Sequence, residues 1–239
     1  MTLDRDPAAL PIEDWPQEVA FVPFVGQRYL EGWNGHRVLL LGESHYRKEG
    51  LTDRPEDTRP FTREEFAPMA NPGRTERWGG FWDALDRVLV GEQDYTPLQA
   101  AEAWERVAFV NQCQVFAGTA ANHRPSAASM RDGGDVIHEH VLPILKPSVV
   151  LVLGRFTWDT LRPGTHMPQV ESYVANGVHR NGPRRYKGLR EVWQLDYKGG
   201  GAWMTWVYHP SWHIDTWKNR AGALHHLLDL KPHAAQTSL

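Results

Sequence analysis

Four short runs of apolar residues stand out along the chain and predict buried β-strands. Each run is continuous rather than alternating, which is typical of strands covered on both faces, as in a parallel sheet packed between helices. The intervals between the runs are long enough for the crossover connections that parallel strands require. The four predicted strands are Val38–Leu41, Val107–Val110, Val149–Leu153 and Trp203–Tyr208.

Three further segments predict helices. Phe81–Val90 is bounded by glycines, Asp135–Leu145 opens with an aspartate that suits an N-cap, and Asn219–Leu230 stops before a proline. Residues 47–80 and 162–200 carry glycines and prolines and are interpreted as long loops. Strands that alternate with helices predict an α/β fold, a three-layer α/β/α domain around a central, mainly parallel sheet of about four strands.

The length allows one large domain or two small ones, and the composition is that of a folded protein. Of 239 residues, 41% are hydrophobic and 23% charged, which excludes a disordered, collagen-like or coiled-coil protein. We expect a single domain over residues 1–239 with an acidic N-terminal extension over residues 1–20. The N-terminus lacks the basic and apolar segments of a signal peptide, and no apolar run has the ~20 residues of a membrane span. A cytoplasmic monomer without membrane partners is therefore expected.

Charge is unevenly distributed. The N-terminal 20 residues hold five acidic residues and one arginine, so they carry −4, and the remainder carries +1 of the total of −3. Residues 177–193 carry a local charge of +4 with aromatic residues between the basic ones. Such a stretch suits a phosphate backbone, or else is a solvated loop. The candidate DNA-binding residues here are Arg184, Arg185 and Lys187.

Each predicted strand is followed by glycine or polar residues. Ligands of open parallel sheets bind beyond the carboxyl ends of the strands, so these residues are expected to converge on one crevice. The four stretches are Gly42-Glu43-Ser44-His45-Tyr46, Asn111-Gln112-Cys113-Gln114, Gly154-Arg155 and His209-Pro210-Ser211-Trp212-His213.

In this order, the four stretches resemble the uracil-DNA glycosylase superfamily over about residues 38 to 215. In that family the first strand ends in a water-activating loop, Gly-Gln-Asp-Pro-Tyr or, in the family-four branch, Gly-Glu-x-Pro-Gly. The second strand delivers an asparagine that reads the flipped-out base. The third ends in a Leu-Gly or Trp-Gly turn before a helix, and the fourth ends in His-Pro-Ser. The resemblance implies a DNA glycosylase.

The catalytic residues implied by the resemblance suit hydrolysis of an N-glycosidic bond. That reaction passes through an oxocarbenium-like sugar and expels the base as an anion, so it needs a carboxylate near the sugar and a donor aimed at the base. Glu43 matches the family-four glutamate and would position water and stabilise the sugar cation. His209 would donate to the departing base. Otherwise Glu43 caps loop amides and His209 is a turn histidine. No lysine lies in the four stretches to form a Schiff base, so the enzyme is expected to be monofunctional.

The same resemblance assigns binding roles. Asn111 would read the Watson–Crick edge of a base, with Tyr46 and Ser44 beside it. The other interpretations are a turn-forming asparagine and a packed tyrosine. Ser211 would hold a phosphate of duplex or single-stranded DNA. Trp212 and His213 lie where the family inserts a side chain into the duplex.

Two departures from the family pattern bear on substrate and cofactor. Ser44 stands where the Gly-Gln-Asp-Pro-Tyr form has its catalytic aspartate, and His45 replaces the loop proline. A modified pyrimidine is therefore favoured over uracil as substrate. A hypermodified cytosine of phage DNA is one such base, and Arg47, Lys48, Trp78 and His213 would contact its sugar. A single cysteine, Cys113, cannot hold the iron–sulfur cluster of the family-four branch within one chain, so no cofactor is expected.

Four alternatives stay open. Uracil excision in DNA repair and binding of modified DNA without cleavage both fit the resemblance. Gly42 to Tyr46 also suggests the nucleophile elbow of a serine hydrolase, although Tyr46 replaces its second glycine. A zinc site would need histidines such as the pairs His209/His213, His138/His140 and His225/His226. Pro210 disfavours a continuous helix between the first two, so they are not expected to share a helical face, and no metal is expected.

Overall fold

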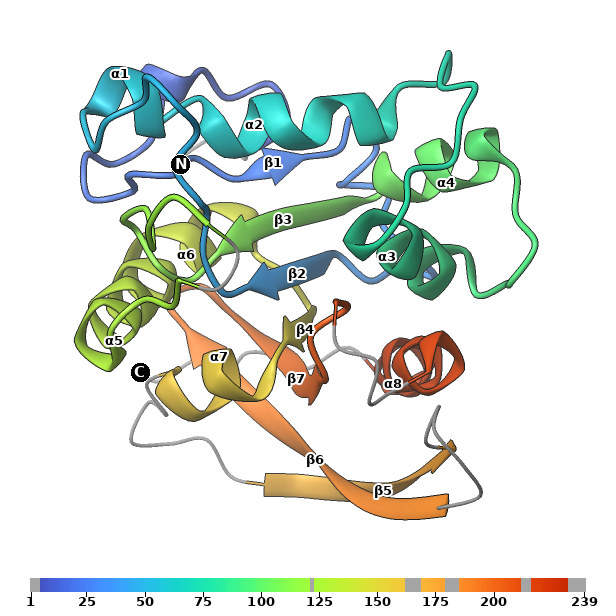
Figure 1. Cartoon of the computed structure of the whole chain (residues 1–239). Helices are drawn as coiled ribbons and strands as arrows, with labels where there is room; N and C mark the ends of the chain where they lie inside the picture. The colour runs from blue at the N-terminus through green and yellow to red at the C-terminus, as the bar shows by residue number, and fades with distance from the viewer. Residues whose placement is uncertain (1–4, 121–122, 162–168, 179–184, 212–215, 232–239) are drawn as a thin grey trace.

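The computed structural model describes residues 5–120, 123–161, 169–178, 185–211 and 216–231, and it shows an α/β fold. A seven-stranded sheet has the strand order β1-β3-β2-β4-β7-β6-β5 (Figure 1). Its strands are β1 (Phe24–Val25), β2 (Val38–Gly42), β3 (Val107–Asn111), β4 (Val149–Leu153), β5 (Gln169–Val178), β6 (Arg185–Tyr197) and β7 (Gly200–Val207).

The four predicted strands form the centre of this sheet. β3, β2, β4 and β7 are adjacent and parallel, and the residues of β2, β3 and β4 are all buried, as their apolar runs predict. The prediction of about four, mainly parallel strands was wrong in number. β1 pairs antiparallel with β3, and β6 and β5 add antiparallel strands beyond β7, so the sheet is mixed.

Helices cover both faces of the sheet. One face packs against α3 (Phe81–Val90), α4 (Pro97–Trp104) and α8 (Trp217–Asp229). The other packs against a continuous helical stretch made of α5 (Ala127–Val136), a π-helical turn (Ile137–Val141) and α6 (Leu142–Leu145). Shorter helices are α1 (Pro55–Thr58), α2 (Phe61–Phe66), α7 (Arg155–Thr160) and the 3-10 turns Ile12–Asp14 and Ala67–Ala70. Two separate apolar clusters therefore stabilise a three-layer arrangement.

The helix predicted over Asp135–Leu145 begins earlier, at a different cap. The Ser126 hydroxyl accepts a hydrogen bond from the Ser129 amide at 3.0 Å, and α5 then runs through a pair of glycines. Glycine lowers helix propensity, which hid this segment in the sequence. Packing explains Gly133, because a Cβ there would lie 1.9 Å from the carbonyl oxygen of Gln112.

The two predicted long loops both contain regular structure. Residues 47–80 include α1, α2 and a 3-10 turn, and residues 162–200 include the hairpin of β5 and β6. The hairpin was missed because its strands are polar and glycine-containing, without the apolar runs of the central strands.

The acidic N-terminal segment packs on the domain. Trp15 and Val19 are buried in the cluster under β2 and β4. The Arg59 guanidinium donates to the carbonyl oxygens of Ile12, Trp15, Pro16 and Val19, which holds this segment in place. Within the described ranges, no helix has the length and apolar character needed to cross a membrane.

Candidate active site

The carboxyl ends of the four parallel strands lie at one edge of the sheet. Gly42 at the end of β2 pairs with Asn111 of β3, and Leu153 of β4 pairs with Val207 of β7. The connection after β2 leads to the helices of one face, whereas the connection after β3 leads to the other face. In open α/β sheets, ligands bind at the strand ends where the connections diverge in this way.

Asn111 is held at the centre of this edge. Its side chain is buried, and a Cβ added to Gly42 would lie only 2.1 Å from its Oδ1. Glycine at position 42 therefore makes room for the asparagine amide. The Asn111 carbonyl accepts a hydrogen bond from the Gln114 side chain at 3.0 Å, which fixes the turn that follows. The close approach between position 42 and the Asn111 side chain thus explains why glycine stands before Glu43.

The loop after β2 is anchored by His45. Cys113 and Ala117 donate their backbone amides to the carbonyl oxygens of Glu43 and His45, so the loop continues beside the segment after β3. The His45 ring is buried against Phe21 and Phe61, and its Nε2 is 2.8 Å from the Thr62 hydroxyl. Burial lowers the pKa of His45 to about 3. His45 is therefore a structural anchor between the two candidate residues Glu43 and Tyr46.

Glu43 is half-buried at the start of this loop. Burial raises the pKa of its carboxyl, and the nearby Arg124 cation partly opposes that shift. Burial and the charge of Glu43 raise the pKa of Tyr46. The positive charge of Arg124 acts on Glu43, Tyr46 and His209, which lie on the loops after β2 and β7. The structure therefore groups residues from the loops after β2, β3 and β7.

Three buried side-chain oxygens near this edge have no hydrogen-bond partner among the described residues. They are Ser44 Oγ, Gln112 Oε1 and Thr157 Oγ1. Buried polar atoms are nearly always paired, so such a group indicates a place for water or a ligand. The serine hydrolase alternative is not supported, because the structure gives Ser44 no bonded base within the described ranges and no helix directly follows β2.

His209 lies directly after β7 as a neutral ring. Its Nδ1 accepts a hydrogen bond from the Ser211 amide at 3.3 Å, so the neutral ring carries its proton on Nε2. Burial, followed by the charges of Arg220 and Arg124, lowers the pKa of His209 to about 4. The ring stacks on Phe81 with 5.4 Å between the centroids. An Nε2–H donor is therefore present at neutral pH.

A glycine separates the loops that carry Glu43 and His209. β4 lies between β2 and β7 and ends before Gly154, whose φ of +134° favours glycine. A Cβ at Gly154 would lie 3.8 Å from the Cβ of His209 and 3.5 Å from the Thr157 hydroxyl. Because adjacent strands are about 4.8 Å apart, β2 and β7 are about 10 Å apart, which suits a ligand of nucleoside size between them.

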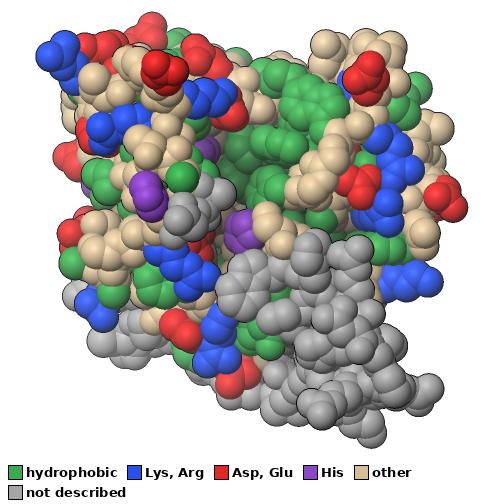
Figure 2. Space-filling view, in the orientation of Figure 1, with side chains coloured by type: hydrophobic (Ala, Val, Ile, Leu, Met, Phe, Trp, Pro, Cys, Tyr) green, Lys and Arg blue, Asp and Glu red, His purple; other side chains and the backbone are tan. Residues whose placement is uncertain are grey.

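Partly exposed aromatic side chains adjoin His209. Phe81 and Trp82 begin α3, and Trp82 contacts Phe81, Trp78 and Phe66 at ring distances between 4.8 and 6.1 Å. Figure 2 shows a hollow lined by hydrophobic side chains on this face, with a histidine at its rim. Aromatic rings at the edge of a hollow offer flat surfaces for stacking.

Other predicted contacts are only partly described. Ser211 is exposed beside His209, whereas Trp212, His213 and Arg184 lie outside the described residues. Arg185 and Lys187 are on β6. Since Trp193 pairs with Met204 and β7 ends at Val207, the first residues of β6 extend past the carboxyl edge of β7. The hairpin therefore brings its basic sequence toward the edge that carries the site.

Two of the residues proposed to contact a sugar are engaged in ion pairs. Arg47 forms an ion pair with Asp53, and Lys48 forms one with Glu65. Trp78 lies instead with the α3 aromatics, 5.5 Å from the Arg74 guanidinium. Trp78 therefore belongs to the aromatic group at the start of α3, with Trp82 as its neighbour.

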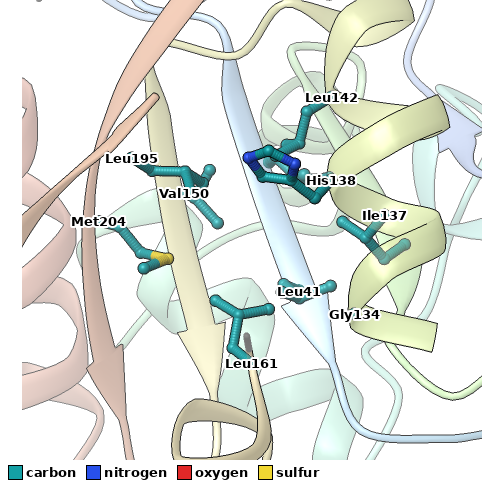
Figure 3. A pocket seen from close by; sticks show the side chains of 10 residues that line it. Leu41, Gly134, Ile137, His138, Leu142, Val150, Leu161, Leu195 and Met204 are labelled. Atoms are coloured by element: carbon teal, nitrogen blue, oxygen red, sulfur yellow. The ribbon is translucent and has the colours of Figure 1, made fainter. Parts of the chain in front are cut away.

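Metal ligation finds no support in the described part of the chain, which holds no cluster of three or more metal-ligating side chains. His138 Nε2 is 2.8 Å from the carbonyl oxygen of Asp196. A cavity of about 10 Å³ beside it, room for a single water, is lined almost entirely by apolar side chains (Figure 3). Its lining residues Leu39 and Leu41 belong to the cluster between the sheet and α5, so this cavity is separate from the crevice.

Sequence reasoning missed three residues of the site. Phe81 was assigned only to a helix, and it directly follows Gly79 and Gly80, the second of which has a φ of +65°. Arg124 lies between β3 and α5 and had no distinguishing signal. Arg220 lies at helical spacing with Ala223 and Leu224 on the buried face of α8. A cation on an apolar helix face is the signal that would have found it.

A scan against models of known protein families finds no match, and a search among curated proteins finds none either. The class of the protein therefore rests on its own fold and site. The fold is a three-layer α/β domain, and the site combines a carboxyl, an amide and a neutral imidazole at one sheet edge.

Proposed function

We propose that this protein is a monofunctional DNA glycosylase that flips out a base, hydrolyses its N-glycosidic bond and leaves an abasic site. The observation that carries the proposal is the grouping of Glu43, Asn111 and His209 at one sheet edge, with a glycine between the loops of Glu43 and His209. These are the groups that the motif resemblance assigns to catalysis and base recognition. Their chemical states also suit the reaction.

The mechanism follows from the position of each group. A flipped base enters the hollow beside Phe81, and Asn111 offers both a donor and an acceptor to its Watson–Crick edge. As the bond between C1′ and the base nitrogen breaks, the base keeps the electron pair and the sugar becomes cationic. The Glu43 carboxylate stabilises that cation and orients a water molecule, whose oxygen forms the new bond to C1′ while the carboxylate accepts its proton. The expelled base anion then takes up a proton from solvent, and Glu43 returns its own to solvent.

His209 acts on the departing base. The neutral ring donates its Nε2–H to a carbonyl oxygen of the base, where negative charge develops as the bond breaks. Its low pKa prevents ring protonation at neutral pH, and protonation of Nδ1 would remove the acceptor of the Ser211 amide. Arg124 adds a positive charge near Glu43 and His209 that favours both the carboxylate and an anionic leaving base.

The proposed substrate is a modified pyrimidine, including a hypermodified cytosine of phage DNA. Ser44 replaces the aspartate of the uracil enzymes, and its buried hydroxyl is unpaired within the described residues, so it is available to a base substituent. The aromatic side chains of Phe81 and Trp82, the first of which stacks on His209, suit a substituent larger than a hydrogen atom. Such a substrate makes the protein a defence enzyme rather than a repair enzyme.

The test of the reaction type is strand cleavage. DNA treated with the protein should break only after alkali or an abasic-site endonuclease is added, because hydrolysis leaves the sugar–phosphate backbone intact. Glu43→Gln is the matched control and should leave the DNA resistant to alkali. Breakage without either treatment would contradict the monofunctional mechanism, and alkali-resistant DNA with the native protein would favour binding without cleavage.

A further inference from the structure

Arg220 is a buried cation that the mechanism above does not use. Only 3% of its surface is exposed, and it lies on the face of α8 that packs on the sheet through Ala223, Leu224 and Leu227. A buried arginine is costly unless its donors are paired. Because Arg220 lies on an otherwise apolar helix face, its guanidinium requires hydrogen-bond acceptors that are buried beside it.

The partner is the backbone at the end of β7. Arg220 Nε donates to the carbonyl oxygen of Tyr208 at 3.0 Å, and its Nη2 donates to the carbonyl oxygen of His209 at 3.1 Å. These carbonyls lie past the last residue of β7, where the sheet ladder has ended. The planar guanidinium presents two donors in a fixed geometry, so it sets both peptide groups at once.

The same backbone carries the candidate donor. Phe81 stacks on the His209 ring, the Ser211 amide donates to Nδ1, and the guanidinium fixes the carbonyl of His209 itself. The charged groups that act on the ring are Arg220 from α8 and Arg124 from the loop after β3. No described residue is hydrogen-bonded to Nε2. The contacts from Phe81, the Ser211 amide and Arg220 together hold the His209 ring in position. Of the three, only the Arg220 contact acts through the His209 backbone.

We propose that Arg220 is a positioning residue that fixes the end of β7 so that His209 is held as a neutral Nε2–H donor in the crevice. This inference rests on the proposed function for its catalytic meaning. Its structural content, the orientation and tautomer of His209, is independent of any substrate. Arg220 then acts through His209 and does not contact the DNA.

Three variants separate geometry from charge. Arg220→Met keeps the volume but removes the charge and both donors, and Arg220→Lys keeps the charge but not the two-donor fork. Arg106→Met is the matched control, because Arg106 also donates to a backbone carbonyl, that of Gly32 at 3.1 Å, but lies at the amino end of β3. Thermal unfolding of each variant establishes that it is folded at the assay temperature.

The first readout is the titration of His209 by nitrogen-15 NMR of the histidine rings, assigned with His209→Gln. The native protein should show a neutral ring with the proton on Nε2. In Arg220→Met the ring should titrate at higher pH and show both tautomers, whereas Arg220→Lys should keep the low pKa but show mixed tautomers. Arg106→Met should match the native protein.

The second readout is single-turnover base release. Arg220→Met should lower the rate about 10–100-fold, the range expected for misplacement of a catalytic group, with the DNA dissociation constant within about twofold of native. Arg220→Lys should lie between. A native tautomer in both folded variants overturns the inference, with or without a loss of rate. If the native protein releases no base, the glycosylase proposal fails, and the NMR result still decides whether Arg220 positions His209. If Arg220→Met is unfolded, Arg220→Lys decides.

Discussion

Replacing His45 by glutamine should make the stability of the fold less sensitive to acid. The native ring is 7% exposed, contacts Phe21 and Phe61, and lies within hydrogen-bond distance of the Thr62 hydroxyl. Protonation of this ring would place a charge among aromatic side chains, in the loop that carries Glu43 and Tyr46. Glutamine keeps a hydrogen-bonding group for Thr62 but takes up no proton.

The magnitude follows from the two pKa values of the ring. Burial, and secondarily the Lys48 cation, lower the pKa of folded His45 to about 3, whereas the ordinary value is 6.5. Between these values the unfolded state binds more protons, so the free energy of unfolding falls as the pH is lowered through 6.5. The slope is about 1.4 kcal/mol per pH unit. At pH 5 the loss relative to neutral pH is about 2 kcal/mol.

Urea unfolding followed by tryptophan fluorescence, at several pH values between about 7.5 and 5, measures this difference. His45→Gln should be less stable than the native protein at neutral pH but should lose about 2 kcal/mol less on going to pH 5. His225→Gln is the matched control, because His225 is exposed on α8, and it should retain the native slope. An equal slope in His45→Gln and native protein would refute the assignment of His45 as a buried neutral anchor.

Four other substitutions test the site and its support. Glu43→Gln and His209→Ala should each lower the single-turnover excision rate roughly 10²–10³-fold with little change in DNA affinity, since both groups act mainly on charge that develops in the transition state. Gly42→Ala should displace the Asn111 amide, which lies 2.1 Å from the new Cβ, and a competition assay should show altered base selectivity. Asp86→Ala should lower the free energy of unfolding in urea by about 3–5 kcal/mol, because it leaves the buried Arg74 guanidinium without its counter-charge. A loss of less than about 1 kcal/mol would contradict that role.

The centre of the fold was predictable because continuous apolar runs mark strands buried on both faces. β4 was predicted with its observed bounds, Val149–Leu153, and α3 likewise, Phe81–Val90. The hairpin of β5 and β6 was not, because its strands are polar and glycine-containing and have no continuous apolar run. The start of α5 was missed because Gly133 serves tight packing on Gln112 rather than helix propensity.

The candidate site was predictable where strand ends determine position. The register at the carboxyl edge of the sheet places Gly42 beside Asn111 and Leu153 beside Val207. Once the strands are located in the sequence, their carboxyl ends give these positions without a further local pattern. Contacts made across long sequence separations were not predictable. Phe81 reaches His209 from 128 residues away, and the fork of Arg220 onto β7 depends on how α8 packs.

Identification of the released base tests the central claim most directly. The purified protein is incubated in parallel with uracil-containing, hypoxanthine-containing and phage-modified DNA, and free bases are identified by mass spectrometry. A free modified pyrimidine should be released from the modified DNA, matched by an equal number of abasic sites and absent with Glu43→Gln. Release of uracil alone would contradict the assigned substrate, and the absence of any free base from all three DNAs would contradict the glycosylase itself.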